Sequence, residues 1–133
     1  MNNDIGISVI GCGGMGMAIV KRLIARDPRL QVRTIYDPSP ESVAKALQEI
    51  NTKPRVCASY QDAVSDPSVD WVMIASWNCF HKEQTIAAFE AGKHVFCQKP
   101  LATSLSDCIA MQDAWRASGK MFNIGFTLRY APH

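Results

Sequence analysis

The chain has 133 residues, of which 47% are hydrophobic and 20% are charged, and its net charge is +2 at pH 7. This length and composition are typical of one folded globular domain and argue against a disordered chain. The small net charge, with no long run of Lys or Arg, disfavours nucleic acid as a partner.

Short apolar runs alternate along the chain with longer stretches of helical periodicity. Residues 5–10 are rich in β-branched residues and stop at glycine, which predicts a buried strand. Ile19, Val20, Leu23 and Ile24 then recur at helical spacing, and Pro28 ends that helix. The same patterns predict further strands at residues 31–36, 55–58, 71–75, 94–97 and 121–124, further helices at 40–50, 79–91 and 105–118, and a short helical turn at 62–65.

Several residues mark the ends of these helices. Ser39 is suited to cap the second helix, and Ser104 or Thr103 to cap the last one. Gly92 and Gly119 follow predicted helices, at positions where glycine commonly stops a helix in the left-handed conformation.

The alternation of strands and helices predicts an α/β fold. Parallel strands with helices on both faces and right-handed crossovers form a doubly wound sheet, for which we expect the strand order 3-2-1-4-5-6. We expect residues 1–125 to form this single Rossmann domain, and residues 126–133 to begin a connection to something further.

A glycine-rich segment, Gly11-Cys12-Gly13-Gly14-Met15-Gly16, joins the first strand to the first helix. In that context its glycine spacing is the dinucleotide fingerprint. Gly11 is expected to permit the tight turn, Gly13 to let a pyrophosphate approach the backbone, and Gly16 to let the helix lie close to the strand. A glycine-rich turn without a ligand is the alternative.

Asp37 ends the second strand about 20 positions after Gly16, the spacing of the acid that binds the adenosine ribose. Its carboxylate would accept hydrogen bonds from both ribose hydroxyls and repel a 2′-phosphate. No Arg or Lys follows in residues 38–40, so NAD is expected rather than NADP. A turn or capping aspartate before proline is the other interpretation.

Two more polar segments follow strands at the same predicted edge of the sheet. Ser76, Trp77 and Asn78 follow the fourth strand near the switch point, where they would flank the nicotinamide and its ribose. His81 lies in the next helical turn, where a structural hydrogen-bond partner is commoner than a proton carrier. Lys99 follows the fifth strand and would orient a substrate hydroxyl, unless it is an ordinary surface lysine.

The whole chain resembles the Gfo/Idh/MocA family of oxidoreductases, which includes glucose–fructose oxidoreductases and inositol dehydrogenases. The resemblance depends on the glycine fingerprint, on Asn78-x-x-His81, and on the segments 91–95, 97–102, 125–126 and 129–132. It implies that Lys99 is the active-site lysine, the only catalytic residue we assign. It further implies cofactor-binding roles for Gly11, Gly13, Gly14, Met15, Gly16, Asp37, Asn78, His81 and Arg129. We expect Ser76 and Trp77, from the loop after the fourth strand, and Gln98, beside Lys99, to complete this cofactor site.

The chain departs from the family pattern in two residues and in length. Gln98 stands where the family usually has glutamate, and Trp77 where it usually has proline. Family members look like two-domain proteins whose second domain supplies substrate contacts and usually an Asp and a His. Residues 126–133 would begin the connection to that substrate domain, which we expect to be missing here.

Our leading hypothesis is an enzyme fragment whose parent oxidises a hydroxyl of a sugar, cyclitol or related polyol with NAD, or runs the reverse. A stand-alone, non-catalytic NAD-binding or NAD-sensing module is the alternative, and a domain for another adenosine ligand, such as a methyl donor, is a third. The exposed apolar surface expected near residues 122–130 predicts a homo-oligomer.

The remaining expectations concern metals, membranes and compartment. The five cysteines, at positions 12, 57, 79, 97 and 108, include no Cys-x-x-Cys pair that would favour zinc, so no metal is expected. Most lie in or beside apolar stretches, as reduced thiols of a cytoplasmic protein do. No signal peptide is visible, and no apolar stretch approaches the roughly 20 residues of a membrane span.

Overall fold

A computed structural model describes residues 3–132 of the chain. Residues 1, 2 and 133, which belong to the two predicted segments 1–125 and 126–133, lie outside the described residues. The described part is a six-stranded parallel sheet in the order β3-β2-β1-β4-β5-β6, which confirms the predicted topology. The strands are β1 (Ile5–Ile10), β2 (Leu30–Tyr36), β3 (Arg55–Val56), β4 (Trp71–Ile74), β5 (His94–Gln98) and β6 (Phe122–Gly125).

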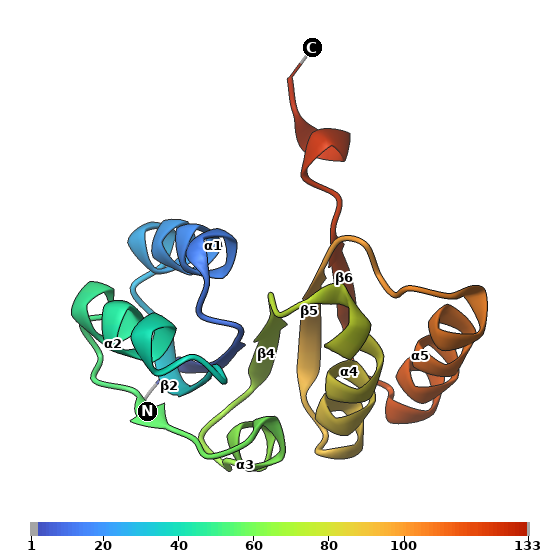
Figure 1. Cartoon of the computed structure of the whole chain (residues 1–133), viewed down its shortest axis with the longest axis horizontal. Coiled ribbons are helices and arrows are strands. Elements are labelled where there is room, and N and C mark those ends of the chain that lie inside the picture. Colours follow the sequence, from blue (N-terminus) through green and yellow to red (C-terminus); the bar gives the residue numbers. More distant parts are fainter. Residues whose placement is uncertain (1–2, 133) are drawn as a thin grey trace.

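Helices cover both faces of this sheet (Figure 1). They are α1 (Gly14–Arg26), α2 (Pro40–Glu49), α3 (Tyr60–Val64), α4 (His81–Glu90) and α5 (Leu105–Ser118), with 3-10 turns η1 (Asn78–Phe80) and η2 (Thr127–Tyr130). Of these helices, none within residues 3–132 has both the length and the apolar character that crossing a membrane requires.

The predicted helix ends are present. The Ser39 hydroxyl accepts a hydrogen bond from the Ser42 amide at 3.3 Å, and the Ser104 hydroxyl accepts one from the Asp107 amide at 3.1 Å. Gly119 ends α5 with φ +66°, in the left-handed conformation. Capping by short polar side chains and glycine therefore fixes where these helices begin and end.

Three predicted elements differ from the observed ones. The strand predicted at 55–58 has only two residues, although the Cys57 amide still donates to the Ile35 carbonyl oxygen of β2 at 2.9 Å. The Ala58 amide bonds the Asp62 carboxylate at 3.4 Å, in the turn that leads into the next helix. The turn predicted at 62–65 is the helix α3, which starts earlier because the Ser59 hydroxyl caps it at the Asp62 amide. The helix predicted at 79–91 is divided into η1 and α4.

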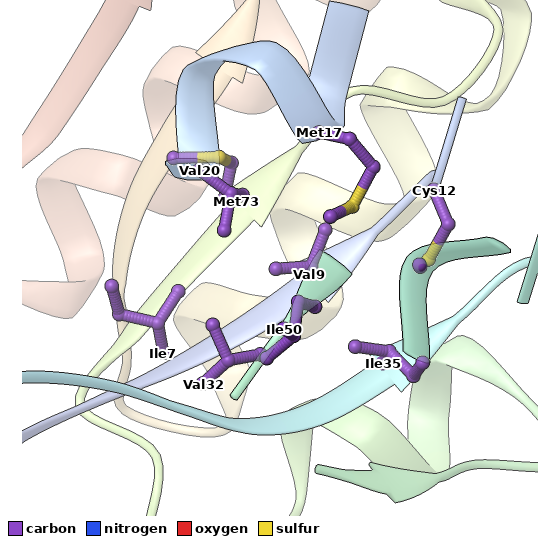
Figure 2. Close-up of a cluster of buried hydrophobic side chains, with 10 residues drawn as sticks. Ile7, Val9, Cys12, Met17, Val20, Val32, Ile35, Ile50 and Met73 are labelled. Carbon is purple, nitrogen blue, oxygen red and sulfur yellow. The ribbon is translucent and has the colours of Figure 1, made fainter. Parts of the chain in front are cut away.

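The sheet packs an apolar core on each face. Val9, Val32, Ile35 and Met73 of the strands meet Met17 and Val20 of α1 on one side, in the cluster that Figure 2 shows. On the other side, strand residues Val72, Ile74, Val95 and Cys97 meet Val64 of α3, Ala88 and Phe89 of α4, and Met111 of α5. These buried side chains hold the strand ends in place, and the loops that follow them carry the polar residues.

The order of the strands in the sheet changes direction between β1 and β4. Residues 7–10 of β1 pair with residues 71–74 of β4, and Ile10 lies opposite Ile74 at the carboxyl ends of the two strands. The chain crosses from β1 toward β2 in one direction and from β4 toward β5 in the other. Such a switch point leaves a crevice at the carboxyl edge, where ligands of doubly wound sheets bind.

Candidate functional site

The loop from β1 to α1 requires glycine at two positions for packing alone. Gly11 has φ +92°, and a Cβ there would lie 2.5 Å from the carbonyl carbon of Ala75 and from the amide nitrogen of Ser76. A Cβ at Gly16 would lie 2.5 Å from the Gly11 carbonyl oxygen. These two glycines let the loop and the start of α1 lie directly against the end of β4.

Gly13 and Gly14 face open space instead. A Cβ at either position would meet no atom within 4 Å. Gly13 is the N-cap of α1, no side chain caps the helix there, and its first turn holds no acidic residue. Uncapped amides and the positive end of the helix dipole favour an anion, so the loop has the form of a cradle for a pyrophosphate.

Asp37 holds the end of β2 next to this loop. One carboxylate oxygen accepts the Cys12 amide at 2.7 Å, and the other accepts the Ser39 amide at 2.8 Å. Burial and the Asp37 charge raise the pKa of the Cys12 thiol to about 12, so this thiol stays protonated at physiological pH. The carboxylate is half-buried and keeps room to accept further hydrogen bonds.

A cleft of about 390 Å³ lies beside the glycine loop, at the carboxyl edge of the sheet. Five of the sequence-predicted site residues line it, namely Gly11, Gly13, Asp37, Ser76 and Trp77. Its other lining residues are Ile10, Tyr36, Pro38, Ser39, Ser42, Tyr60, Ala75, Phe80, Glu83 and Gln84. The cleft therefore joins an open backbone turn, a carboxylate and several aromatic side chains in one concave surface.

Sequence reasoning missed the aromatic and α4 side of this cleft. Phe80 stands two positions after Asn78, so its place in the same loop was the available signal. Tyr60 begins α3, which the sequence predicts only as a turn further on. Burial and the nearby Glu83 carboxylate raise the pKa of the Tyr60 hydroxyl, which therefore stays a hydrogen-bond donor. Gln84 of α4 accepts a hydrogen bond from the Ser76 hydroxyl at 2.5 Å.

A second groove, of about 410 Å³, runs between α1 and α2 beside Gly13 and Gly14. Lys21 and Lys45 line it, and Lys21 forms an ion pair with Glu49 at 3.4 Å. Residues 38–40 hold no cation for a 2′-phosphate, but Lys21 of α1 and Lys45 of α2 lie in this groove. These two lysines were not predicted from the sequence, because they come from other parts of the chain.

The other predicted site residues do not line the cleft. Met15 is 62% exposed, and Asn78 is exposed in η1. Arg129 lies beyond β6 with its guanidinium carbon 5.8 Å from the centroid of the Phe126 ring. Asn78 and Arg129 follow the carboxyl ends of strands, and Met15 lies at the start of α1, but the structure does not bring these three residues together at the cleft.

The end of β5 carries Gln98 and Lys99. Gln98 is buried, and its side-chain oxygen accepts the Lys99 amide at 3.2 Å. A Cβ on Gly125 would lie 2.0 Å from that oxygen, so glycine in β6 makes room for it. The Lys99 side chain is exposed. Gln98 thus stabilises the backbone beneath Lys99 and leaves the lysine itself free to face a ligand.

The cysteines give a direct test of this arrangement. At pH 8 we expect iodoacetamide to modify the exposed Cys79 far faster than Cys12 or Cys97. Both of the latter are buried, and burial raises each pKa to about 12, so neither forms the reactive thiolate. Mass spectrometry of the peptides measures the rates, and Cys79→Ser should remove the fast phase. Modification of Cys12 as fast as Cys79 would contradict the buried position of the Cys12 side chain.

Comparison with known proteins places this geometry in a family. Residues 5–126 match the profile described as an oxidoreductase family with an NAD-binding Rossmann fold. Over 95% of its length the chain is 35% identical to inositol 2-dehydrogenase of Gluconacetobacter diazotrophicus, of which it covers 38%. It is also 35% identical over 95% of its length to 2,7-anhydro-N-acetylneuraminate hydratase of Escherichia coli, of which it covers 32%.

A solved structure agrees. Levoglucosan dehydrogenase, in complex with NADH and levoglucosan, superposes on 95% of this chain with a TM-score of 0.86 and 29% identity. The chain covers 36% of that structure. The chain therefore spans between about a third and two-fifths of the length of the relatives named here, and residues 5–126 of this chain match the family's NAD-binding Rossmann fold.

Proposed function

Because the chain belongs to the Gfo/Idh/MocA oxidoreductase family, we propose that it is the NAD-binding unit of an enzyme acting on a hydroxyl of a sugar, cyclitol or related polyol. The family membership and the NAD-binding fold support the cofactor. The inositol and levoglucosan dehydrogenases among its relatives support the substrate class.

The observation that carries this proposal is the pairing of Asp37 with the glycine loop. The carboxylate accepts the Cys12 amide at 2.7 Å, so the ribose-binding acid and the phosphate cradle have a fixed separation. Both border the same cleft. An adenosine ribose on Asp37 and a pyrophosphate at Gly13 and Gly14 would satisfy the free acceptor sites and the uncapped amides together.

The chain's own residues would divide the work as follows. The amides at the start of α1 hold the pyrophosphate, Asp37 accepts from the ribose hydroxyls, and Ser76, Trp77 and Asn78 border the nicotinamide half. Bound NAD supplies a carbon that accepts a hydride. Lys99 orients the substrate hydroxyl and stabilises negative charge on its oxygen. Gln98 and Arg129 are assigned to the surroundings of the cofactor, as the family resemblance implies.

We propose that residues 1–125 are the dinucleotide-binding domain and that 126–133 lead toward a substrate domain. Hydride transfer requires the substrate carbon to be held within about 3.5 Å of the cofactor. Among the described residues Lys99 is the one side chain assigned to the substrate. The chain alone is therefore expected to bind NAD without turning over a polyol.

Calorimetry with NAD, run beside an NADH-absorbance assay on a panel of polyols, tests this function. We expect binding and no turnover, and we expect Lys99→Ala to leave the affinity for NAD unchanged, because Lys99 does not line the cleft. Failure to bind NAD at millimolar concentration would refute the proposal. Polyol-dependent NADH production by the pure chain would instead refute the expectation that this chain needs a substrate domain for turnover. If a longer protein that contains this chain binds NAD but turns over no polyol, the result would favour the non-catalytic NAD-sensing module.

Self-association of this chain is a further expectation. Leu105 and Ile109 of α5 are 77% and 50% exposed, and they share an apolar groove of about 270 Å³ with Phe122 and Ile124 of the edge strand β6. Contiguous exposed apolar surface commonly marks a contact between proteins. Light scattering should show a species heavier than a monomer, and Ile109→Glu should shift it toward monomer. A monomer at every concentration would contradict the expectation.

A further inference from the structure

His81, the first residue of α4, is a buried polar side chain that the cleft does not use. Its ring is only 1% exposed. Nδ1 lies 2.8 Å from the Pro100 carbonyl oxygen, and Nε2 lies 3.1 Å from the Ser76 carbonyl oxygen. The ring therefore stands between the loop after β4 and the segment after β5.

The two carbonyl groups belong to different parts of the proposed site. Ser76 lines the cleft, where its hydroxyl donates to Gln84 of α4. Pro100 follows Lys99 directly, and the Lys99 amide is held from the other side by Gln98. Besides the direct pairing of β4 with β5, one path from the cleft wall to the backbone that carries Lys99 thus passes through a buried imidazole.

Both partners of the ring are acceptors. A neutral imidazole has one N–H group, so it can donate to only one of the two oxygens. The contact from Nδ1 is the shorter one, and it joins residues 19 positions apart. We assign the proton to Nδ1, which makes the bond to Pro100 the tie between the two segments.

We propose that His81 is a positioning residue that couples occupation of the cleft to the segment carrying Lys99. This inference rests on the proposed function, because it takes the cleft to be the dinucleotide site. A ligand that moves the Ser76 loop would move the start of α4 and, through the Nδ1–H bond, the backbone at Lys99 and Pro100.

The test uses ADP as the probe, because ADP carries the ribose and pyrophosphate but no nicotinamide to reach Lys99 directly. Amide NMR shifts of the ¹⁵N-labelled chain report the cleft at Ser76 and Trp77, and the second segment at Lys99 and Leu101. In the unmodified chain we expect ADP to shift both pairs.

Two substitutions separate the ends of the ring. His81→Asn keeps a donor near Nδ1, so both pairs of amides should still respond. His81→Gln moves the donor toward the Nε2 position, so Ser76 and Trp77 should respond while the response of Lys99 and Leu101 is lost. His94→Asn is the matched control, since His94 lies at the opposite end of β5 and should leave every response intact. Thermal melts establish that each variant is folded.

Each outcome is decisive. Loss of the Lys99 and Leu101 response in His81→Gln, with its retention in His81→Asn, supports the coupling. An unchanged response in His81→Gln overturns it. The coupling is also overturned if ADP shifts only the Ser76 and Trp77 amides of the unmodified chain. That result does not depend on any variant being folded, and it is compatible with the proposed function. No response to ADP or to NAD anywhere refutes the proposed function, and the coupling falls with it.

Discussion

Replacing Asp37 by Ala is expected to raise the dissociation constant for NAD by about 10- to 100-fold. The loss has two sources. The ribose hydroxyls lose a charged acceptor, and such a hydrogen bond contributes roughly 1.5–3 kcal/mol. The Cys12 and Ser39 amides also lose the carboxylate that holds the loop beside the end of β2. Titration calorimetry at a fixed salt concentration measures the change.

The same variant should narrow the preference for NAD over NADP. In the unmodified chain the carboxylate repels a 2′-phosphate, so NADP should bind more weakly. Asp37→Asn is the matched control, because it keeps the size and an acceptor but removes the charge. It should lower the affinity for NAD less than Ala does while still improving NADP. Equal affinities of the unmodified chain for NAD and NADP would contradict the role of Asp37. In that case, a loss of NADP binding in Lys45→Ala would place the 2′-phosphate in the groove between α1 and α2.

Adding one methyl group to the glycine loop should lower the stability of the fold at Gly11 but not at Gly13. Gly11→Ala is expected to destabilise the fold by about 2–5 kcal/mol, because alanine at φ +92° is strained and its Cβ would overlap the Ala75–Ser76 backbone. The midpoint of thermal unfolding should then fall by roughly 10–20 °C. Gly13→Ala should leave that midpoint nearly unchanged, because its Cβ would enter open space and φ is −69°.

Gly13→Ala is instead expected to lower the affinity for NAD. The methyl group of Gly13→Ala would occupy the space proposed for the pyrophosphate, so binding should weaken by about tenfold or more in a folded protein. Calorimetric melts and NAD titrations on the two variants make the comparison. A Gly13→Ala chain with normal affinity would show that the open space at Gly13 is not the phosphate site.

The fold was predictable from sequence because its determinants are local. Apolar periodicity and the caps at Ser39, Ser104 and Gly119 decide where most strands and helices lie, and right-handed crossovers then leave few possible strand orders. The errors came from side chains that take over a backbone group from outside the element. The Ser59 hydroxyl accepts the Asp62 amide and starts α3 earlier than the turn predicted at 62–65.

The site was less predictable because its walls come from distant segments. Gly11, Asp37 and Ser76 could be placed, since each directly follows a predicted strand. Tyr60 and Gln84 face the same cleft only because α3 and α4 pack beside each other under that edge of the sheet. His81 matches a family motif, but its burial between two carbonyl groups depends on the path of residues 99–100, which no spacing in the sequence reveals.

The bonds from Asp37 to the Cys12 and Ser39 amides also bear on the speed of recognition. An acid and an anion cradle that already hold their separation lose little conformational freedom when a dinucleotide arrives. Encounter then needs no slow rearrangement of the loop, so dinucleotides that differ only at the 2′ position should associate at similar rates. Discrimination between them would reside in how long each remains bound, as is usual among related complexes at one site.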